Sequence, residues 1–301
     1  MSALLSSAAA PAHPARFRDL LAAEWIKLWS LRSTWASFAL ILLAMVGLAI
    51  HAALATHAGW PDWPAERRAV RSPLWDAFPT EAQMFVVLAA SGVGAVAIGS
   101  EYASGLMRTT FAAVPRRGAV AAAKLTVLTG VLTLLGMLGA AAAFAGSQAI
   151  LADVGANMSV GDPGALRGIA ASALLVPLCA LVGMALAALT RHTAPAIVTA
   201  ATVLLLLPTA VDEDERWSAL LRHAMPVPAW QRLIEPTGPP PWMTDIYPAT
   251  VAGAWTTYAG WAVATALITT LALNRRTPNP PTHPTSPTPT LTLLIMRLAA
   301  V

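Results

Sequence analysis

Long stretches without a single charged residue constrain this chain more than any other feature. A helix needs about 20 apolar residues to span roughly 30 Å of hydrocarbon. Stretches of about that length lack Asp, Glu, Lys and Arg at residues 35–56, 83–100, 125–150, 168–190, 193–211 and 249–273. They are apolar on every face, whereas strands of a membrane barrel alternate apolar and polar residues. The sequence therefore predicts an all-α polytopic membrane protein with six transmembrane helices.

Composition supports this class, because only 11% of the residues are charged and a soluble domain carries about a quarter. The second stretch is short, and the fifth has Pro195 and Pro208 near its ends. Pro177, in the middle of the fourth stretch, predicts a kink. The single cysteine, Cys179, excludes an internal disulfide and suggests no thiol-based metal site. We expect no cleaved signal peptide, because residues 1–16 lack a basic start and a long apolar run.

The distribution of basic residues predicts the orientation, because Lys and Arg in short loops prefer the cytoplasmic side. With the N-terminus inside, 12 of the 19 basic residues and only three of the 15 acidic residues fall on the inner side. We therefore expect a multi-pass membrane protein with both termini cytoplasmic. The basic overall charge then reflects membrane topology, and we expect no binding to nucleic acid.

The segment before the first apolar stretch, "FRDLLAAEWIKLWSLRSTW", has helical periodicity. Leu21, Trp25, Leu28 and Arg32 recur at spacings of four, three and four, which aligns them on one side of a helix. Trp25 suits the lipid headgroup region, and Lys27 and Arg32 suit anionic lipid. The pattern predicts an amphipathic helix on the inner membrane surface. A plain cytoplasmic extension of the first span is the alternative.

A second patterned segment, "GSEYASGLMRTTFAAVPRRGAVAAAK", lies between the second and third apolar stretches. Met107, Phe111 and Val114 stand at i, i+4 and i+7, which gives one apolar face about two turns long. Arg108 points elsewhere, and Pro115 ends the run. Such a helix is too short to span the membrane. It could lie on lipid or insert into a groove on a cytoplasmic partner, and an ordinary solvated loop is the third possibility.

These two segments carry a resemblance to a known family. The patterns E-x-x-K-x-x-S-x-R-S/T-x-W and E-Y-x-x-G-x-x-R/K-x-x-L/F-x-x-x-P-x-R, placed before the first span and after the second, resemble the permease subunits of bacterial ABC exporters of the type-2 class, particularly actinobacterial ones. The resemblance covers residues 16–276. The matching residues are Glu24, Lys27, Ser30, Arg32, Ser33 and Trp35 in the first segment, and Glu101, Tyr102, Gly105, Arg108, Thr109, Thr110, Phe111, Pro115, Arg117 and Lys124 in the second.

The resemblance implies a membrane subunit that exports an unidentified substrate with energy from a separate ATPase subunit. It implies pairing with a second permease copy or relative, contact with membrane lipid, and an N-terminal interfacial helix containing Glu24, Trp25, Lys27 and Arg32. The inner segment would be a coupling helix that docks on the ATPase. That ATPase-coupling segment would comprise Glu101, Tyr102, Gly105, Met107, Arg108, Phe111, Pro115 and Arg117.

The lysine inventory agrees with a separate ATPase. A phosphate-binding loop of the form G-x-x-x-x-G-K-[ST] needs a lysine after glycine, yet the only lysines are Lys27, after Ile26, and Lys124, after Ala123. We therefore expect that this chain is a transport subunit and not an enzyme. We expect it to bind no cofactor, because the partner subunit would hold ATP and Mg.

Two other functions remain open from the sequence. The first is a non-transporting membrane anchor or immunity-type protein that binds a cytoplasmic partner through its inner loop. An integral membrane enzyme is the least favoured, because the apolar stretches carry no charge and only one histidine, His51, near an outer end. Ser91, Ala95 and Gly99, spaced by four, instead predict close helix packing within the bundle or at a twofold axis.

The remaining segments are rich in proline. Residues 1–15 are expected to be a disordered N-terminus, and the Pro/Thr-rich tail at 277–301 is of low complexity and cannot build a core. The loop at 212–248, expected on the outer side, is expected to be irregular. Its Trp217, Trp230 and Trp242 are expected at the membrane–water interface on that side. The acidic residues at its start, "DEDE", are expected to keep the loop in contact with water. The alternative is that they form a pore mouth that attracts cations.

Overall fold

The computed structural model describes residues 16–30, 32–114, 116–235, 247 and 249–275. Within these ranges the secondary structure is helical and contains no strand, which confirms the expected all-α class. Five helical segments are long and apolar enough to cross a membrane: Arg32–Asp62, Leu74–Ala103, Arg117–Ala152, Ala165–Thr190 and Val251–Asn274. The predictions for residues 1–15 and 277–301, Pro115 and Trp242 lie outside the described residues.

The first apolar segment contains a π-helical turn, and the fifth, shorter one contains another. The first consists of α2 (Arg32–Leu42), the turn η1 (Leu43–Gly47) and α3 (Leu48–Gly59). The long uninterrupted helices are α6 (Thr80–Ala103), α8 (Arg117–Ala152), α9 (Ala165–Thr190) and α14 (Val251–Arg275). The fifth consists of α10 (Thr193–Ala201), the turn η3 (Thr202–Leu206) and α11 (Leu207–Thr209).

This fifth segment is shorter than the other five. Thr193–Thr209 is continuously helical and apolar, but at 1.5 Å per residue it is about 25 Å long. The hydrocarbon core is roughly 30 Å thick. By length and composition the structure therefore contains five full spanning helices and one shorter apolar helix in its described part.

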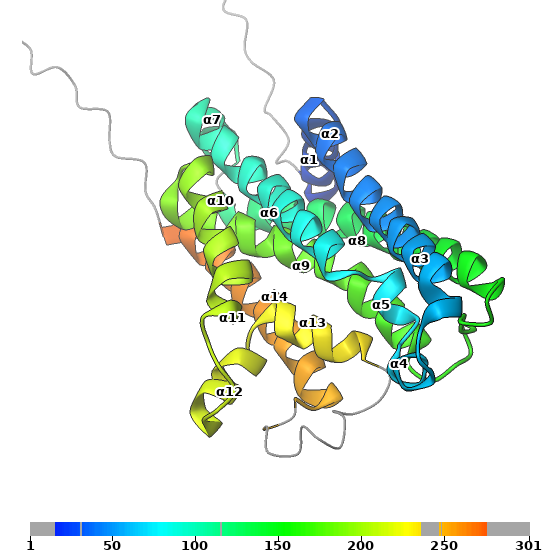
Figure 1. Cartoon of the computed structure of the whole chain (residues 1–301). Coiled ribbons are helices and arrows are strands. Elements are labelled where there is room, and N and C mark those ends of the chain that lie inside the picture. Colours follow the sequence, from blue (N-terminus) through cyan, green and yellow to red (C-terminus); the bar gives the residue numbers. More distant parts are fainter. Residues whose placement is uncertain (1–15, 31, 115, 236–246, 248, 276–301) are drawn as a thin grey trace, which may run out of the picture.

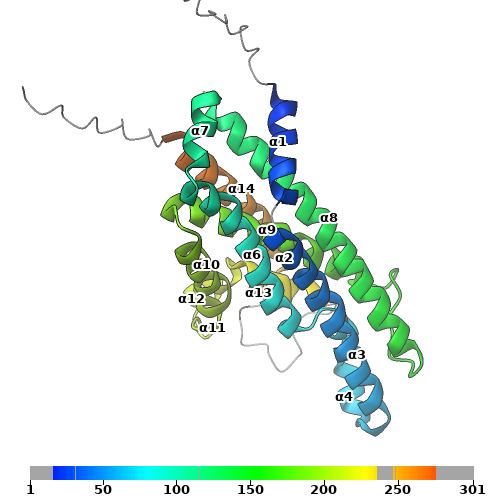
Figure 2. The ribbon, with the colours of Figure 1, turned by 90° about the horizontal axis from the view of Figure 1, so that it is seen from above.

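The helices form an elongated bundle with distinct ends (Figure 1). One end carries α1 (Phe17–Ser30) and α7 (Leu106–Ala113), and α4 (Ala65–Val70) and α12 (Arg216–His223) lie at the opposite end. In Figure 2, α1 lies along the first part of α8. Asn274 in the last turn of α14 approaches Gly118 in the first turn of α8, so α14 ends where α7 and α8 meet. We refer to this as the α7 end. Short helices at the opposite end also include η2 (Trp60–Asp62) and α5 (Leu74–Ala77).

Glycines bring α6 and α9 into backbone contact at the centre of the bundle. A Cβ atom added at Gly94 would lie 1.8 Å from the Ala180 carbonyl oxygen, and one added at Gly183 would lie 1.9 Å from the Ser91 carbonyl oxygen. A Cβ atom added at Gly99 would lie 2.2 Å from the Thr193 Oγ1 atom at the start of α10. The small residues expected to permit close packing therefore do so within the bundle.

The loop at 212–248 is more ordered in its described part than the sequence predicted. Residues 216–223 form α12, before which the Glu215 N–H donates to Ser218 Oγ at 3.3 Å. Residues 226–234 form α13 (Pro226–Ile234), where Pro226 stands at a first-turn position at which a missing N–H costs nothing. Trp230 is fully buried, and its indole N–H donates to Ser172 Oγ at 3.0 Å. The prediction of an irregular chain was therefore wrong for these residues, as was the interfacial placement of Trp230. Trp217 is 68% exposed.

Candidate functional site

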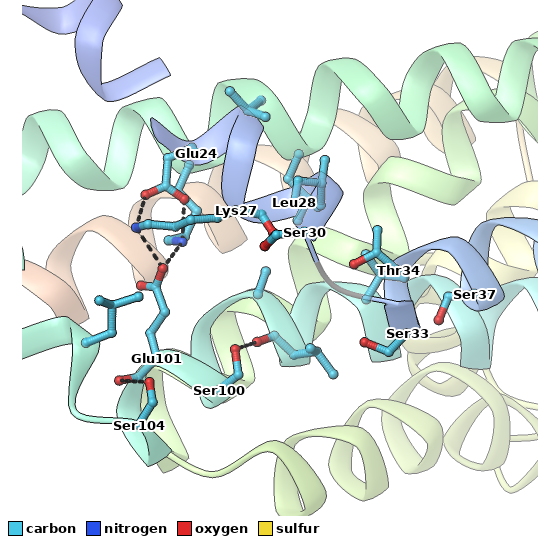
Figure 3. Close-up of a pocket in the computed structure, with 17 residues that line it drawn as sticks. Glu24, Lys27, Leu28, Ser30, Ser33, Thr34, Ser37, Ser100, Glu101 and Ser104 are labelled. Atoms are coloured by element: carbon cyan, nitrogen blue, oxygen red, sulfur yellow. Dashed lines mark hydrogen bonds and ion pairs between the residues drawn. The ribbon is translucent and has the colours of Figure 1, made fainter. Parts of the chain in front are cut away.

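Four charged side chains from three helices meet at the α7 end of the bundle. Glu24 and Lys27 come from α1, Glu101 from the last turn of α6, and Lys124 from α8 (Figure 3). Lys27 Nζ donates to Glu24 Oε1 at 2.7 Å, and Lys124 Nζ donates to Glu24 Oε2 at 2.6 Å. Glu101 Oε1 accepts from both lysines at 2.9 Å. We refer to these four residues as the charge cluster.

Three of the four side chains of the charge cluster are almost completely withdrawn from solvent. The side chains of Glu24, Glu101 and Lys124 are each 6% exposed, and that of Lys27 is 30% exposed. Two carboxylates and two ammonium groups cancel, which matters because an unpaired buried charge costs several kcal/mol. Partial burial by itself lowers the pKa of Lys27, but hydrogen bonds and charges from Glu24 and Glu101 outweigh it and hold the pKa above its ordinary value of 10.5. Lys27 is therefore charged at neutral pH.

Glu24 occupies the packed face of α1. Leu20, Glu24 and Leu28 are buried at intervals of four, whereas Leu21 is half-buried and Trp25 is 50% exposed. The packed face thus shares Leu28 with the stripe that the apolar pattern suggested, but it has Leu20 and Glu24 in place of Leu21 and Trp25. This rotation is possible because Glu24 meets cations from its own helix and from α8. Exposed Trp25 is left available to contact lipid.

The middle of the expected coupling segment folds as α7, whereas Glu101 and Tyr102 lie in the last turn of α6 and Arg117 begins α8. A tight turn joins α6 to α7. Gly105, between the two helices, has a φ of 73°, a left-handed conformation that glycine adopts without steric cost. Glu101 lies one turn before it, at the end of α6. The exposed surface of α7 includes Arg108, Thr109 and Ala112.

The apolar face of α7 packs against the protein itself. Met107 is buried in the main core, and Phe111 and Val114 pack against a small cluster that contains Leu20 of α1 and Val120 of α8. The guanidinium of Arg117 lies 5.1 Å from the centre of the Phe111 ring. The face predicted to meet lipid or a partner's groove is therefore occupied internally in this structure.

The structure separates the sequence-predicted residues into two groups. It brings Glu24, Lys27, Glu101 and Lys124 together in the charge cluster, although they belong to two distant motifs. It leaves Arg108 and Trp25 exposed on α7 and α1, and Arg32 exposed at the start of α2. Half-buried Tyr102 stands beside Glu101 in the same turn of α6.

A cavity of about 290 Å³ adjoins the charge cluster between α1, α2, α6 and α8. Part of its wall is apolar, and the rest carries hydroxyl groups, several of which are labelled in Figure 3. Of the six hydroxyl residues in this wall, the family motif includes Ser30 and Ser33, and the sequence analysis missed the other four. Their helical spacings, three and four on α2 and four on α6, were the available signal. The hydroxyl residues are Ser30, Ser33, Thr34, Ser37, Ser100 and Ser104.

One acceptor in this cavity wall is unsatisfied. Glu101 Oε2 is buried and has no hydrogen-bond partner in the described structure. A buried carboxylate oxygen without a donor costs free energy that a bound donor would recover. Among the described residues, no group of three or more His, Cys, Asp or Glu side chains is placed to hold a metal ion.

Comparison with known proteins adds no family assignment. The chain matches no protein-family model and no curated protein. Its function must therefore be inferred from its residues and their arrangement.

Proposed function

We propose that this chain is the permease subunit of an ATP-driven ABC exporter of the type-2 class. It would lie in the bacterial cell membrane with both termini cytoplasmic, pair with a second permease copy or relative, and use separate ATPase subunits. The proposal rests mainly on α7, a short helix between two long apolar helices, at the same end of the bundle as α1. The two family-like motifs lie in these same elements.

The charge cluster supports a route for mechanical coupling. Glu101 precedes α7 by one turn and is bonded to Lys27 of α1 and Lys124 of α8. A displacement of α7 would therefore reach three helices through direct contacts. ATP-driven cycling further requires that the ATPase bind two conformations of the permease with different affinities.

The packing of α7 changes which residues would contact the ATPase. Met107 and Phe111 pack inward on the protein, so they would hold α7 in place. Exposed Arg108, Thr109 and Ala112 would form the docking surface. This surface replaces the one suggested by the apolar periodicity.

The proposed topology requires a sixth crossing. The start of α1 and the end of α14 both lie at the α7 end, and an even number of crossings is needed to return a chain to its starting side. The short helix at Thr193–Thr209 is the candidate. Local bilayer thinning and snorkelling of flanking residues can accommodate a span a few ångströms shorter than the hydrocarbon core.

Co-purification with the ATPase tests the docking surface. The chain would be co-expressed with a P-loop protein encoded beside its gene, and the amount of ATPase recovered on the tagged permease would be measured. We expect Arg108→Glu to reduce the recovered ATPase at least tenfold at limiting concentration, because reversing a charge at a central contact costs roughly 2 kcal/mol or more.

The matched control is Arg18→Glu, a charge reversal at a side chain that is 74% exposed on α1. It should leave recovery at the wild-type level. If Arg108→Glu also recovers wild-type amounts of ATPase, α7 is not the docking helix. A wild-type chain that recovers no P-loop protein would favour the membrane-anchor alternative.

A further inference from the structure

We propose that the cavity beside the charge cluster binds the headgroup of an aminophospholipid such as phosphatidylethanolamine. The site would hold the zwitterionic head together with the first part of one acyl chain. This inference requires only that the chain lie in a bilayer, and it does not depend on a transport cycle.

The free hydrogen-bonding groups of the cavity match the two ends of that headgroup. Glu101 Oε2 is a buried acceptor without a donor that its neighbours enclose, and a primary ammonium would supply that donor once the side chains covering this oxygen shift to admit it. Lys27 Nζ carries three protons, of which two are given to Glu24 and Glu101. Its side chain is also the most exposed of the charge cluster, so its third proton can meet a phosphate oxygen at the cavity mouth.

The charge balance also favours a zwitterion. The charge cluster contains two acids and two bases and is formally neutral. An anionic or purely cationic ligand would place a net charge beside buried groups, which is costly. A phosphate and an ammonium on one headgroup add no net charge.

The cavity changes from charged to mainly apolar along the bundle, and the wall away from the charges also carries the hydroxyls of Thr34 and Ser37 (Figure 3). Glu101 and Lys124 lie at its charged end, and exposed Ser30 and Ser33 lie on its rim (Figure 3). Val93, two turns before Glu101 on α6, lies roughly 12 Å deeper at 1.5 Å per residue. A head of an amphiphile can thus reach the charges while its chain contacts apolar side chains.

The size of the cavity agrees with a headgroup and excludes a whole lipid. Its volume of about 290 Å³ is near the lower limit of small-molecule sites. The remaining acyl chain would continue into the bilayer. Ala97, half-buried in the apolar wall, is where a larger side chain would shorten the cavity without removing a charge.

Lipid binding to the purified full-length chain tests the proposal. Single-chain lysophosphatidylethanolamine and lysophosphatidylcholine would be titrated in detergent and bound lipid counted by native mass spectrometry. Both have the phosphate, but the choline head cannot donate a hydrogen bond. We expect the ethanolamine lipid to bind about tenfold more tightly, as expected for one charge-assisted hydrogen bond.

Variants separate this site from lipid adsorbed elsewhere. Ala97→Phe should lower ethanolamine-lipid affinity to the level of the choline lipid, whereas Leu134→Phe, at a side chain that is 63% exposed on α8, should not change it. Glu101→Gln should also reduce the preference, and Ala97→Phe keeps the test valid if that variant does not fold.

Three results would overturn the assignment. Equal affinity for the two lysolipids would mean that water alone satisfies Glu101. Unchanged binding in Ala97→Phe would place the lipid elsewhere. Binding of dodecylammonium without binding of the ethanolamine lipid would identify a small cationic amphiphile as the occupant in place of a membrane lipid.

Discussion

Lys124 and Lys27 perform the same pairing in the charge cluster but differ in exposure. Lys124 bridges Glu24 and Glu101 from a side chain that is 6% exposed, whereas Lys27 bridges the same carboxylates from one that is 30% exposed. Removing a buried partner leaves an uncompensated charge at a cost of about 3–5 kcal/mol. Water can partly replace an exposed partner, so its loss costs less.

We therefore predict that Lys124→Met lowers the unfolding temperature in detergent by an amount on the order of 10 °C. Lys27→Met should lower it by less than half as much. Thermal unfolding followed by tryptophan fluorescence measures both. The double variant Glu24→Gln, Lys124→Met restores equal numbers of acids and bases and should regain part of the loss. Equal shifts for the two single variants would contradict a cluster organised around the buried Lys124.

The charge cluster also marks what the sequence could predict at single residues. Both motifs drew attention to Glu24, Lys27, Glu101 and Lys124, but nothing local showed that they meet, because Lys124 lies 100 residues from Glu24. An apolar-face pattern treats a glutamate in α1 as solvent-facing. Only a partner from a distant helix makes its burial favourable.

At the scale of elements, the α6–α9 contact determines how closely the central helices can pack. Gly94 and Gly183 each face a carbonyl oxygen of the other helix. No side chain separates the two backbones at these positions. A methyl group there would overlap backbone atoms, which cannot rotate away as the end of a flexible side chain could.

We predict that Gly94→Ala destabilises the protein by about 1–3 kcal/mol or more, because the added carbon forces α6 and α9 apart. Gly92→Ala is the matched control on the same helix, since nothing lies within 4 Å of its added carbon. The unfolding temperature and the yield of monodisperse protein would be compared. Wild-type stability of Gly94→Ala would indicate that the two helices are free to separate.

The sequence predicted the existence of the apolar helices better than their ends. The stretch at 125–150 corresponds to α8, which begins at Arg117, because a charge-free search stops at Lys124 although that lysine is paired and buried. Proline caused the opposite error, because the proline-rich loop was predicted to be irregular, yet Pro226 begins the helix α13. The Trp230 partner, Ser172, is 58 residues away, so no local pattern could place that indole in the core.

For the whole molecule, the central question is whether the short helix at Thr193–Thr209 crosses the membrane. The five longer helices alone would leave α14 ending on the side opposite to the start of the first span. The packing of α14 against α8 instead returns it to the α7 end. The short helix must then carry the chain from His192 at that end to the acidic segment before α12.

We predict that the short helix crosses the membrane, and cysteine accessibility tests this crossing. The variants would be made in a Cys179→Ala background, which removes one fully buried thiol. In intact cells an impermeant maleimide should label Asp214→Cys, and it should reach Thr109→Cys and His192→Cys only after the membrane is permeabilised. All three positions are exposed on the protein, so protection reports the membrane and not burial. If Asp214→Cys is protected together with His192→Cys, the short helix does not cross and the chain has five spans. If Thr109→Cys is labelled in intact cells, α7 faces outward, where no cytoplasmic ATPase can reach it, and the exporter proposal fails.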